Sequence, residues 1–155
     1  MFIQKEIEIT ISDKGFYDIT SIVNEAVSKH RIQKGLCSLF IRHTSASLTI
    51  QENADPRVLE DLTTFLDKIA PEGDNYAHDD EGLDDMPAHI KSMVTNTEIS
   101  IPIKSTKLDL GTWQGIFLIG SVLIPNSVFF SIGLLGSWII SNGLFLSCII
   151  SSDLF

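Results

Sequence analysis

The stretch Leu36-Cys-Ser-Leu-Phe-Ile-Arg-His43-Thr-Ser-Ala-Ser-Leu-Thr-Ile-Gln-Glu-Asn-Ala-Asp-Pro56 places two strand patterns directly before a helix start. Apolar side chains alternate in residues 36–42 and again in residues 46–51, which predicts two strands. Asp55-Pro56 predicts the beginning of a helix, because an Asp side chain accepts hydrogen bonds from free N–H groups and Pro fits the first helical position. The stretch therefore favours a domain in which strands and helices occur together.

The residues on either side continue this mixture. Alternating isoleucines predict strands over residues 7–11 and 99–103, and residues 108–113 are predicted as a further strand. Helical spacing predicts a helix over residues 22–30, with Asp18 or Thr20 as N-cap and Gly35 as its C-terminal stop, an apolar stripe over residues 58–69, and a short helix from Asp85. Because the elements do not follow a strict strand–helix repeat, the sequence predicts an α+β fold rather than a doubly wound sheet.

Composition excludes several classes of protein. The 155 residues correspond to about one domain. A net charge of −9 argues against a nucleic-acid-binding surface, which needs an excess of basic residues. Cys37 and Cys148 do not suggest a disulfide framework, and charges from Lys5 onward leave no signal-peptide apolar core, so we expect a cytoplasmic protein with reduced thiols.

Three of the four histidines, His43, His78 and His89, lie among acids and small hydroxyl residues in the middle third of the chain. Imidazole combined with carboxylate is common ligand chemistry for divalent transition metals and is also suited to acid–base catalysis near neutral pH. His89 falls in the first turn of a predicted helix, where the helix dipole disfavours a positive charge and keeps the ring available as a ligand. We predict one metal site formed by these three histidines, with His89 also taking part in catalysis.

Other polar residues are candidates for catalysis or substrate binding. Glu52 stands at a strand-to-helix junction without an evident structural role, and we predict that it acts as general base or orients a metal ligand. Ser45, beside His43, can bond a phosphate or a ligand imidazole, and Lys91 can meet a phosphate. Asp55 and Asp85 are interpreted as helix caps, and the seven acids in residues 72–85 as a solvated loop.

A block bounded by two glycines, Gly111 and Gly115, holds the last candidates, Thr112 and Gln114. The glycines suggest a tight backbone next to a ligand or a subunit, or else a β-turn that carries a core tryptophan.

Residues 1–118 resemble the YjbQ family of secondary thiamine-phosphate synthase-like proteins. The matching stretches recur in order over about three quarters of the chain: His43-Thr-Ser-Ala-Ser-Leu-Thr-Ile50, Glu52-Asn-Ala-Asp55, Pro71-Glu-Gly73, Glu81-Gly82, Asp84-Asp-Met-Pro-Ala-His-Ile-Lys-Ser92, Ile99-Ser-Ile-Pro-Ile103 and Leu110-Gly-Thr-Trp-Gln-Gly-Ile116. The resemblance implies a sandwich-like, mixed β-sheet core with a few helices, and a homotrimer. It also implies sites near subunit contacts, lined by the residues that match His43, His78 and His89.

The resemblance further implies a function. It points to a metal-dependent protein with a weak thiamine-phosphate synthase activity, which joins a pyrimidine pyrophosphate to a thiazole phosphate. The alternative is a non-catalytic trimeric module that binds a metal and a metabolite. Pyrophosphate departure normally uses Mg²⁺ with oxygen ligands, whereas three histidines prefer Zn²⁺, so the cofactor is expected to be a divalent metal, Zn or Mg, and the partner a small phosphorylated substrate.

The chain departs from this resemblance after residue 118. Between Leu110 and Ser152 it contains no Asp, Glu, Lys, Arg or His, so residues 1–118 are interpreted as a YjbQ-like domain incomplete at its C-terminal end and residues 119–155 as an atypical hydrophobic tail. Three origins are considered: an altered translation product, which is favoured, a membrane or interface anchor, and a pair of rebuilt strands. We expect the tail to be poorly packed or to project as a helix, and to lower solubility and weaken trimerisation.

Overall fold

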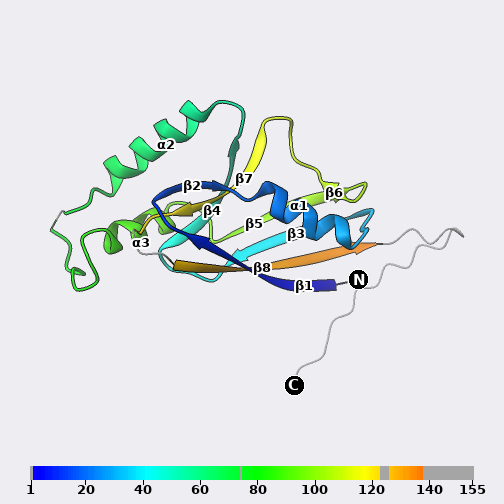
Figure 1. The fold of residues 1–155 in the computed structure, drawn as a ribbon, viewed down its shortest axis with the longest axis horizontal. Coiled ribbons are helices and arrows are strands. Elements are labelled where there is room, and N and C mark those ends of the chain that lie inside the picture. Colours follow the sequence, from blue (N-terminus) through cyan, green and yellow to red (C-terminus); the bar gives the residue numbers. More distant parts are fainter. Residues whose placement is uncertain (1, 74, 123–125, 138–155) are drawn as a thin grey trace, which may run out of the picture.

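Two antiparallel sheets form the framework of the protein. The computed structural model describes residues 2–73, 75–122 and 126–137. The larger sheet has the order β1-β8-β3-β5-β6 and the smaller one the order β2-β7-β4 (Figure 1). In chain order the elements are β1 (Phe2–Ile11), β2 (Gly15–Asp18), α1 (Thr20–Lys29), β3 (Lys34–Ile41), β4 (Ala46–Glu52), α2 (Pro56–Ile69), α3 (Asp85–Met93), β5 (Glu98–Lys104), β6 (Lys107–Leu108), β7 (Gln114–Gly120) and β8 (Asn126–Ser137).

The core lies where the two sheets and α1 meet. Every second residue of β3, namely Cys37, Leu39 and Ile41, is buried, as the alternation in the sequence predicts. Leu48 of β4 and Val23 of α1 are buried in the same cluster, so both sheets and a helix contribute to it. The α+β fold with a sandwich-like sheet core is therefore confirmed, although the described strand pairs are all antiparallel rather than mixed.

Cys37 is part of this apolar packing. Burial raises the pKa of the Cys37 thiol to about 12, so the group stays protonated at neutral pH. It behaves as a small apolar side chain rather than as a nucleophile.

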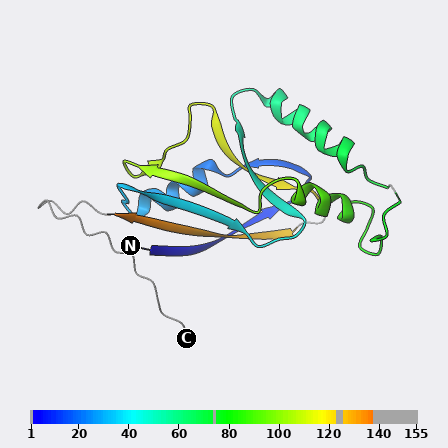
Figure 2. The same ribbon diagram turned by 180° about the vertical axis from the view of Figure 1, so that it is seen from behind.

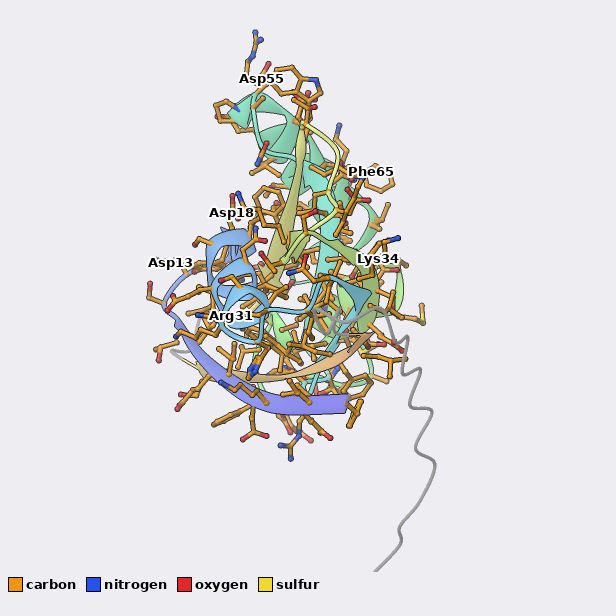
Figure 3. The ribbon with its side chains drawn as sticks, turned by 90° about the vertical axis from the view of Figure 1, so that its right-hand side faces the viewer. Asp13, Asp18, Arg31, Lys34, Asp55 and Phe65 are labelled. Atoms are coloured by element: carbon orange, nitrogen blue, oxygen red, sulfur yellow. The ribbon has the colours of Figure 1, made fainter. Side chains whose placement is uncertain are left out.

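Helix α2 is an outlying element of the fold. Its N-terminus follows the prediction, since Asp55 is the N-cap and its carboxylate accepts from the Arg57 N–H at 3.0 Å. Figure 3 places Asp55 at the far tip of the molecule and Phe65 further along the same helix. Of the apolar stripe on α2 only Leu66 is buried, so this amphipathic helix is largely uncovered within the described residues. Helix α3 packs against β4 at the end of the smaller sheet that is opposite Asp55 (Figure 2). There it lies next to the C-terminal part of α2.

Two local predictions differ from the structure, and one short strand is not predicted. Residues 108–113 are not one strand: β6 ends at Leu108 and β7 begins at Gln114, with a turn between them. Gly15 opens the short strand β2, which sequence alternation does not indicate. Gly35 is not the stop of α1, because that helix ends at Lys29 and Arg31 takes the left-handed conformation at φ 51°.

Gly35 has a different role, in the close approach of β3 to β8. It pairs with Gly136, and a Cβ at Gly35 would lie 2.1 Å from the Leu135 carbonyl oxygen. A Cβ at Gly136 would lie equally close to Ile32. No side chain fits at such separations, so the two glycines allow the two strands to come together.

The expectation of a poorly packed tail is wrong for the part of the tail that the structure describes. The division at residue 118 falls inside β7, and β8 lies between β1 and β3 in the larger sheet. Val128, Phe130, Ile132 and Leu134 of β8 are fully buried, because they alternate with residues that face outward. The strand structure of this segment therefore depends on its pairing with β1 and β3, which are distant in the sequence, and not on the pattern of charged residues. Residues 138–155 lie outside the described residues, and no helix within the described ranges is long and apolar enough to cross a membrane.

Candidate metal centre

Three side chains from the loop before α3 and from α3 itself converge on one point. The Nε2 atom of His78 lies 2.9 Å from Oδ2 of Asp85, and the Nε2 atom of His89 lies 3.1 Å from the same oxygen. The two imidazole rings are 5.6 Å apart between centroids. Asp85 and His89 are one helical turn apart on α3, so the helix alone brings them together, whereas His78 is supplied by the preceding loop. This group of two nitrogens and one carboxylate oxygen could hold a metal ion.

The Thr44 carbonyl determines the tautomer of the neutral His89 ring. The Nδ1 atom of His89 lies 3.1 Å from the Thr44 carbonyl oxygen. A carbonyl oxygen only accepts hydrogen bonds, so Nδ1 carries the hydrogen and the neutral ring has its lone pair on Nε2. That lone pair and the Asp85 carboxylate face each other at 3.1 Å, an arrangement that repels unless a cation or a proton stands between them. A histidine that donates through its second nitrogen to a backbone carbonyl is typical of metal ligands.

His43 lies beside this group but is held differently. The Ser45 backbone N–H donates to Nδ1 of His43 at 2.9 Å, and the Ser45 hydroxyl donates to Oδ1 of Asp85 at 3.4 Å. The loop from His43 to Ser45 thus contacts both His89 and Asp85. His43 is absent from the converging group, so the structure puts Asp85 in the place that the sequence analysis assigned to His43.

A cavity of about 500 Å³ lies beside His43, Asp85 and His89. It is lined by His43, Thr44, Ser45, Glu81, Asp84, Asp85, His89 and Val122. The cavity is large enough for a small metabolite, and its lining is dominated by polar side chains.

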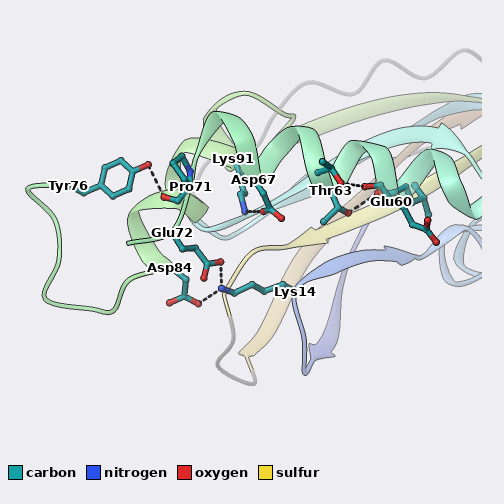
Figure 4. A network of polar contacts seen from close by, with 11 residues as sticks. Lys14, Glu60, Thr63, Asp67, Pro71, Glu72, Tyr76, Asp84 and Lys91 are labelled. Atoms are coloured by element: carbon teal, nitrogen blue, oxygen red, sulfur yellow. Dashed lines mark hydrogen bonds and ion pairs between the residues drawn. The ribbon is translucent and has the colours of Figure 1, made fainter. Parts of the chain in front are cut away.

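Lys14 ties the loop that carries His78 to the β1–β2 turn (Figure 4). Its ammonium group pairs with Glu72 and, at 3.1 Å, with Asp84. Burial acts to lower the pKa of Lys14, but the hydrogen bonds to Glu72 and Asp84 outweigh burial and raise that pKa above its ordinary value. Lys14 therefore stays charged, and it neutralises Asp84 at the rim of the cavity.

Lys91 is on another face of α3 and does not reach the cavity of His43 and Asp85. Its side chain is buried, and the ammonium group lies 2.7 Å from Oδ1 of Asp67 on α2 (Figure 4). This ion pair links α3 to α2, which is a structural contact rather than the phosphate contact predicted for Lys91.

Glu52, Thr112 and Gln114 lie away from the histidines. Glu52 ends β4 and pairs with Gln114 at the start of β7, whereas Ser45 immediately precedes β4. Glu52 is seven positions after Ser45 along an extended strand, which corresponds to roughly 23 Å. The Gln114 side chain accepts from the Gly111 N–H at 2.8 Å and closes the turn that also carries Thr112. Within one chain these residues form a separate polar group at the opposite end of the smaller sheet.

Asp85 is the residue of the site that sequence reasoning missed as a functional group. The sequence pattern indicates a helix cap at this position, but the N-cap of α3 is Asp84, without a side-chain capping bond. Asp85 is buried and contacts both histidines. The spacing of Asp85 and His89, four residues apart at the start of a predicted helix, is the signal that could have identified it.

Comparison with known proteins agrees with the fold described above. Residues 5–122 match the family model described as UPF0047 protein YjbQ-like. A UPF0047 protein of Synechocystis sp. is 50% identical over 116 residues, which cover 74% of this chain and 79% of that protein. The UPF0047 protein YjbQ of Escherichia coli O157:H7 is 42% identical over 119 residues, which cover 76% and 86% of the two chains.

Two solved structures extend the comparison. A YjbQ/UPF0047 protein of Clostridium acetobutylicum has a TM-score of 0.70 at 37% identity and covers 84% of this chain and 98% of its own. A YbjQ-like protein of unknown function from Sulfolobus solfataricus has a TM-score of 0.76 at 25% identity and covers 88% and 99%. The Sulfolobus structure covers 88% of this chain, whereas residues 1–122 make up less than four fifths of it. That match therefore includes residues beyond 122, the part of the chain that contains β8.

Proposed function

This chain belongs to the YjbQ-like UPF0047 family, and on that premise we propose that it binds a divalent metal ion through His78, Asp85 and His89. The observation that carries the proposal is the approach of His78 Nε2 and His89 Nε2 to one Asp85 oxygen, at 2.9 and 3.1 Å. The Thr44 carbonyl beside Nδ1 of His89 favours the neutral tautomer with a lone pair on Nε2. A shared cation relieves the repulsion between two such groups.

The residue types and spacing fit a zinc-like ion. Two ligand atoms of a tetrahedral zinc ion with bonds of about 2.1 Å lie about 3.4 Å apart. The separations of 2.9 and 3.1 Å from Asp85 Oδ2 to the two Nε2 atoms are close to this value. Two imidazoles and one carboxylate suit Zn²⁺ or a similar transition ion, whereas Mg²⁺ prefers oxygen ligands throughout, so zinc is proposed over magnesium.

The cavity beside the three ligands would receive a small phosphorylated compound. A bound ion would supply Lewis-acid polarisation of a substrate oxygen. The chain itself orients the ligands, through the Thr44 carbonyl on His89 and the Ser45 hydroxyl on Asp85. More specifically, we propose that the substrates are a pyrimidine pyrophosphate and a thiazole phosphate, which the protein would join. The alternative is that the protein binds a metabolite without turnover.

Metal analysis of the purified protein tests the proposal. We expect one zinc ion per chain, released by a strong chelator and taken up again with a rise in the thermal midpoint, because an ion that binds only the folded state stabilises it. Less than a tenth of an ion per chain after incubation with zinc and dialysis would contradict it. Turnover of pyrimidine pyrophosphate with thiazole phosphate, lost in His89→Ala, supports the enzyme, and a rate unchanged by that substitution rules out synthase activity at this centre.

The homotrimer is also proposed, with the uncovered apolar face of α2 as the contact between copies. A groove of about 460 Å³ runs between α2 and the smaller sheet, and its lining includes Phe16, Leu62, Phe65, Ile69 and Val94. Phe65 is more than half exposed, which is unusual for a large apolar residue on an amphipathic helix. A second copy of the chain would cover this surface.

Phe65→Glu tests this contact. We expect the wild-type protein to have about three times the 17.2 kDa mass of one chain by light scattering, and the variant to be a monomer, because a buried unpaired carboxylate is unfavourable. Thr64→Glu introduces the same charge at the neighbouring exposed position and should remain a trimer. A Phe65→Glu protein with the wild-type mass would exclude this face as the contact.

A further inference from the structure

The loop from His43 to Ser45 sets opposite tautomers in two neighbouring histidines. The Ser45 backbone N–H donates to Nδ1 of His43 at 2.9 Å, and an amide N–H cannot accept. Nδ1 of His43 is therefore the acceptor, and the neutral ring carries its hydrogen on Nε2. The adjacent Thr44 carbonyl does the reverse for His89, whose Nδ1 must carry the hydrogen.

This difference assigns the two rings different chemistry. His89 presents a lone pair on Nε2 toward Asp85, as a metal ligand must. In His43 the lone pair of Nδ1 is already bonded to Ser45, and Nε2 carries a hydrogen, so neither nitrogen is available to a metal. The polar group that remains free on His43 is a hydrogen-bond donor.

The surroundings of His43 leave this donor for a ligand. His43 lines the same cavity as Asp85 and His89, and within the described residues its Nε2 makes no hydrogen bond to the protein. Of the carboxylates in the cavity lining, Asp85 is held by the two histidines and Ser45, and Asp84 is paired with Lys14. A ligand that contacts both a metal at His78, Asp85 and His89 and an N–H donor must offer a lone pair to each, as a phosphate does through two of its oxygens.

We propose that His43 donates a hydrogen bond from Nε2 to an oxygen of a phosphate group bound in this cavity, beside the metal held by His78, Asp85 and His89. The inference rests on the proposed metal centre. Without the cation, the carboxylates Glu81 and Asp85 would repel an anion, so phosphate should bind only to the metal-loaded protein. With the cation, the hydrogen bond from His43 is made to a charged acceptor, which is the stronger kind.

Two substitutions of His43 separate its two hydrogen bonds. Asn places an oxygen where Nδ1 stands, so His43→Asn keeps the acceptor for the Ser45 N–H and loses the donor to the cavity. Gln places an amide N–H near the position of Nε2, so His43→Gln keeps the donor and loses the acceptor. His30→Asn makes the same change at the fourth histidine, at the C-terminal end of α1 and outside the cavity lining.

The experiment measures inorganic phosphate binding by calorimetry to zinc-loaded, dialysed protein at constant ionic strength. His43→Asn should weaken binding about tenfold or more, the usual loss for a hydrogen bond to a charged group. His43→Gln and His30→Asn should stay within about threefold of the wild type, and all three variants should retain zinc. Nitrogen NMR of the metal-free wild type should find the hydrogen on Nε2 of His43 and on Nδ1 of His89.

Each contrary result has a distinct meaning. A hydrogen on Nδ1 of His43, wild-type phosphate affinity in His43→Asn, or loss of zinc from His43→Asn overturns the role of His43 and leaves the metal centre intact. Zinc-loaded wild type that does not bind phosphate overturns the phosphate site alone. Wild type that takes up no zinc overturns the proposed metal centre and this inference with it.

Discussion

Asp85→Asn is expected to weaken zinc binding at least about 100-fold, because it removes the only carboxylate of the proposed ligand group while keeping the shape of the side chain. The Asp85 carboxylate is also the contact shared by His78 and His89, so its loss leaves the two imidazoles without a common partner. His89→Ala should have an effect of similar size. The measurement is a zinc competition titration against a chromophoric chelator, together with the thermal midpoint with and without zinc.

Asp80→Asn provides the matched control for this experiment. Asp80 is an exposed acid in the same loop as His78 and does not line the cavity, so its loss changes the net charge by the same amount. Its zinc affinity should stay within about threefold of wild type, because exposed charges act weakly through water. If the two Asn variants bind zinc equally well, general attraction by the acidic loop explains the binding and Asp85 is not a ligand.

Phe130→Ala is expected to destabilise the folded protein by about 3–5 kcal/mol, the usual cost of deleting a large buried side chain. Phe130 is fully buried at the centre of β8 and is paired with Ile7 of β1 and Ile41 of β3. Domains of this size are stable by about 5–15 kcal/mol, so the loss is a large part of the total. Chemical denaturation followed by tryptophan fluorescence and circular dichroism measures it.

The adjacent residue on the opposite face of β8 provides the comparison. Phe129 is 37% exposed, and Phe129→Ala makes the same chemical change at a cost of about 1 kcal/mol. A large difference between the two variants means that β8 is a packed strand of the native sheet. Equal and small effects would mean that the hydrophobic segment after residue 118 does not belong to the core.

The sequence identified the elements that local signals specify. Asp55-Pro56 marks the start of α2, and the alternation of Cys37, Leu39 and Ile41 marks the buried face of β3, because capping and strand periodicity depend on neighbours in the chain. β8 could not be identified in this way. Its apolar run is compatible with a membrane segment or a strand, and its pairing partners, β1 and β3, are about a hundred residues away in the chain.

The same distinction applies to the site. His78 and His89 could be singled out as residue types, and the fold brings them together. Their third partner follows from the loop geometry, which attaches His43 to Ser45 and leaves Asp85 between the other two rings. Glu52 is only nine residues from His43 in the sequence, but β4 is extended and carries it to the other end of the smaller sheet.

The position of β1 in the larger sheet determines the order in which the protein can fold during synthesis. Among the strands that the structure describes, β1 lies at the edge of that sheet and pairs only with β8, with Phe2 opposite Leu135. β3 and β5 can pair as soon as residue 104 has left the ribosome, but β1 must wait until β8 has emerged. Of the described strands, β1 is thus translated first and is among the last to be paired. Until then its unpaired backbone and its partly buried isoleucines are accessible to chaperones and to other nascent chains.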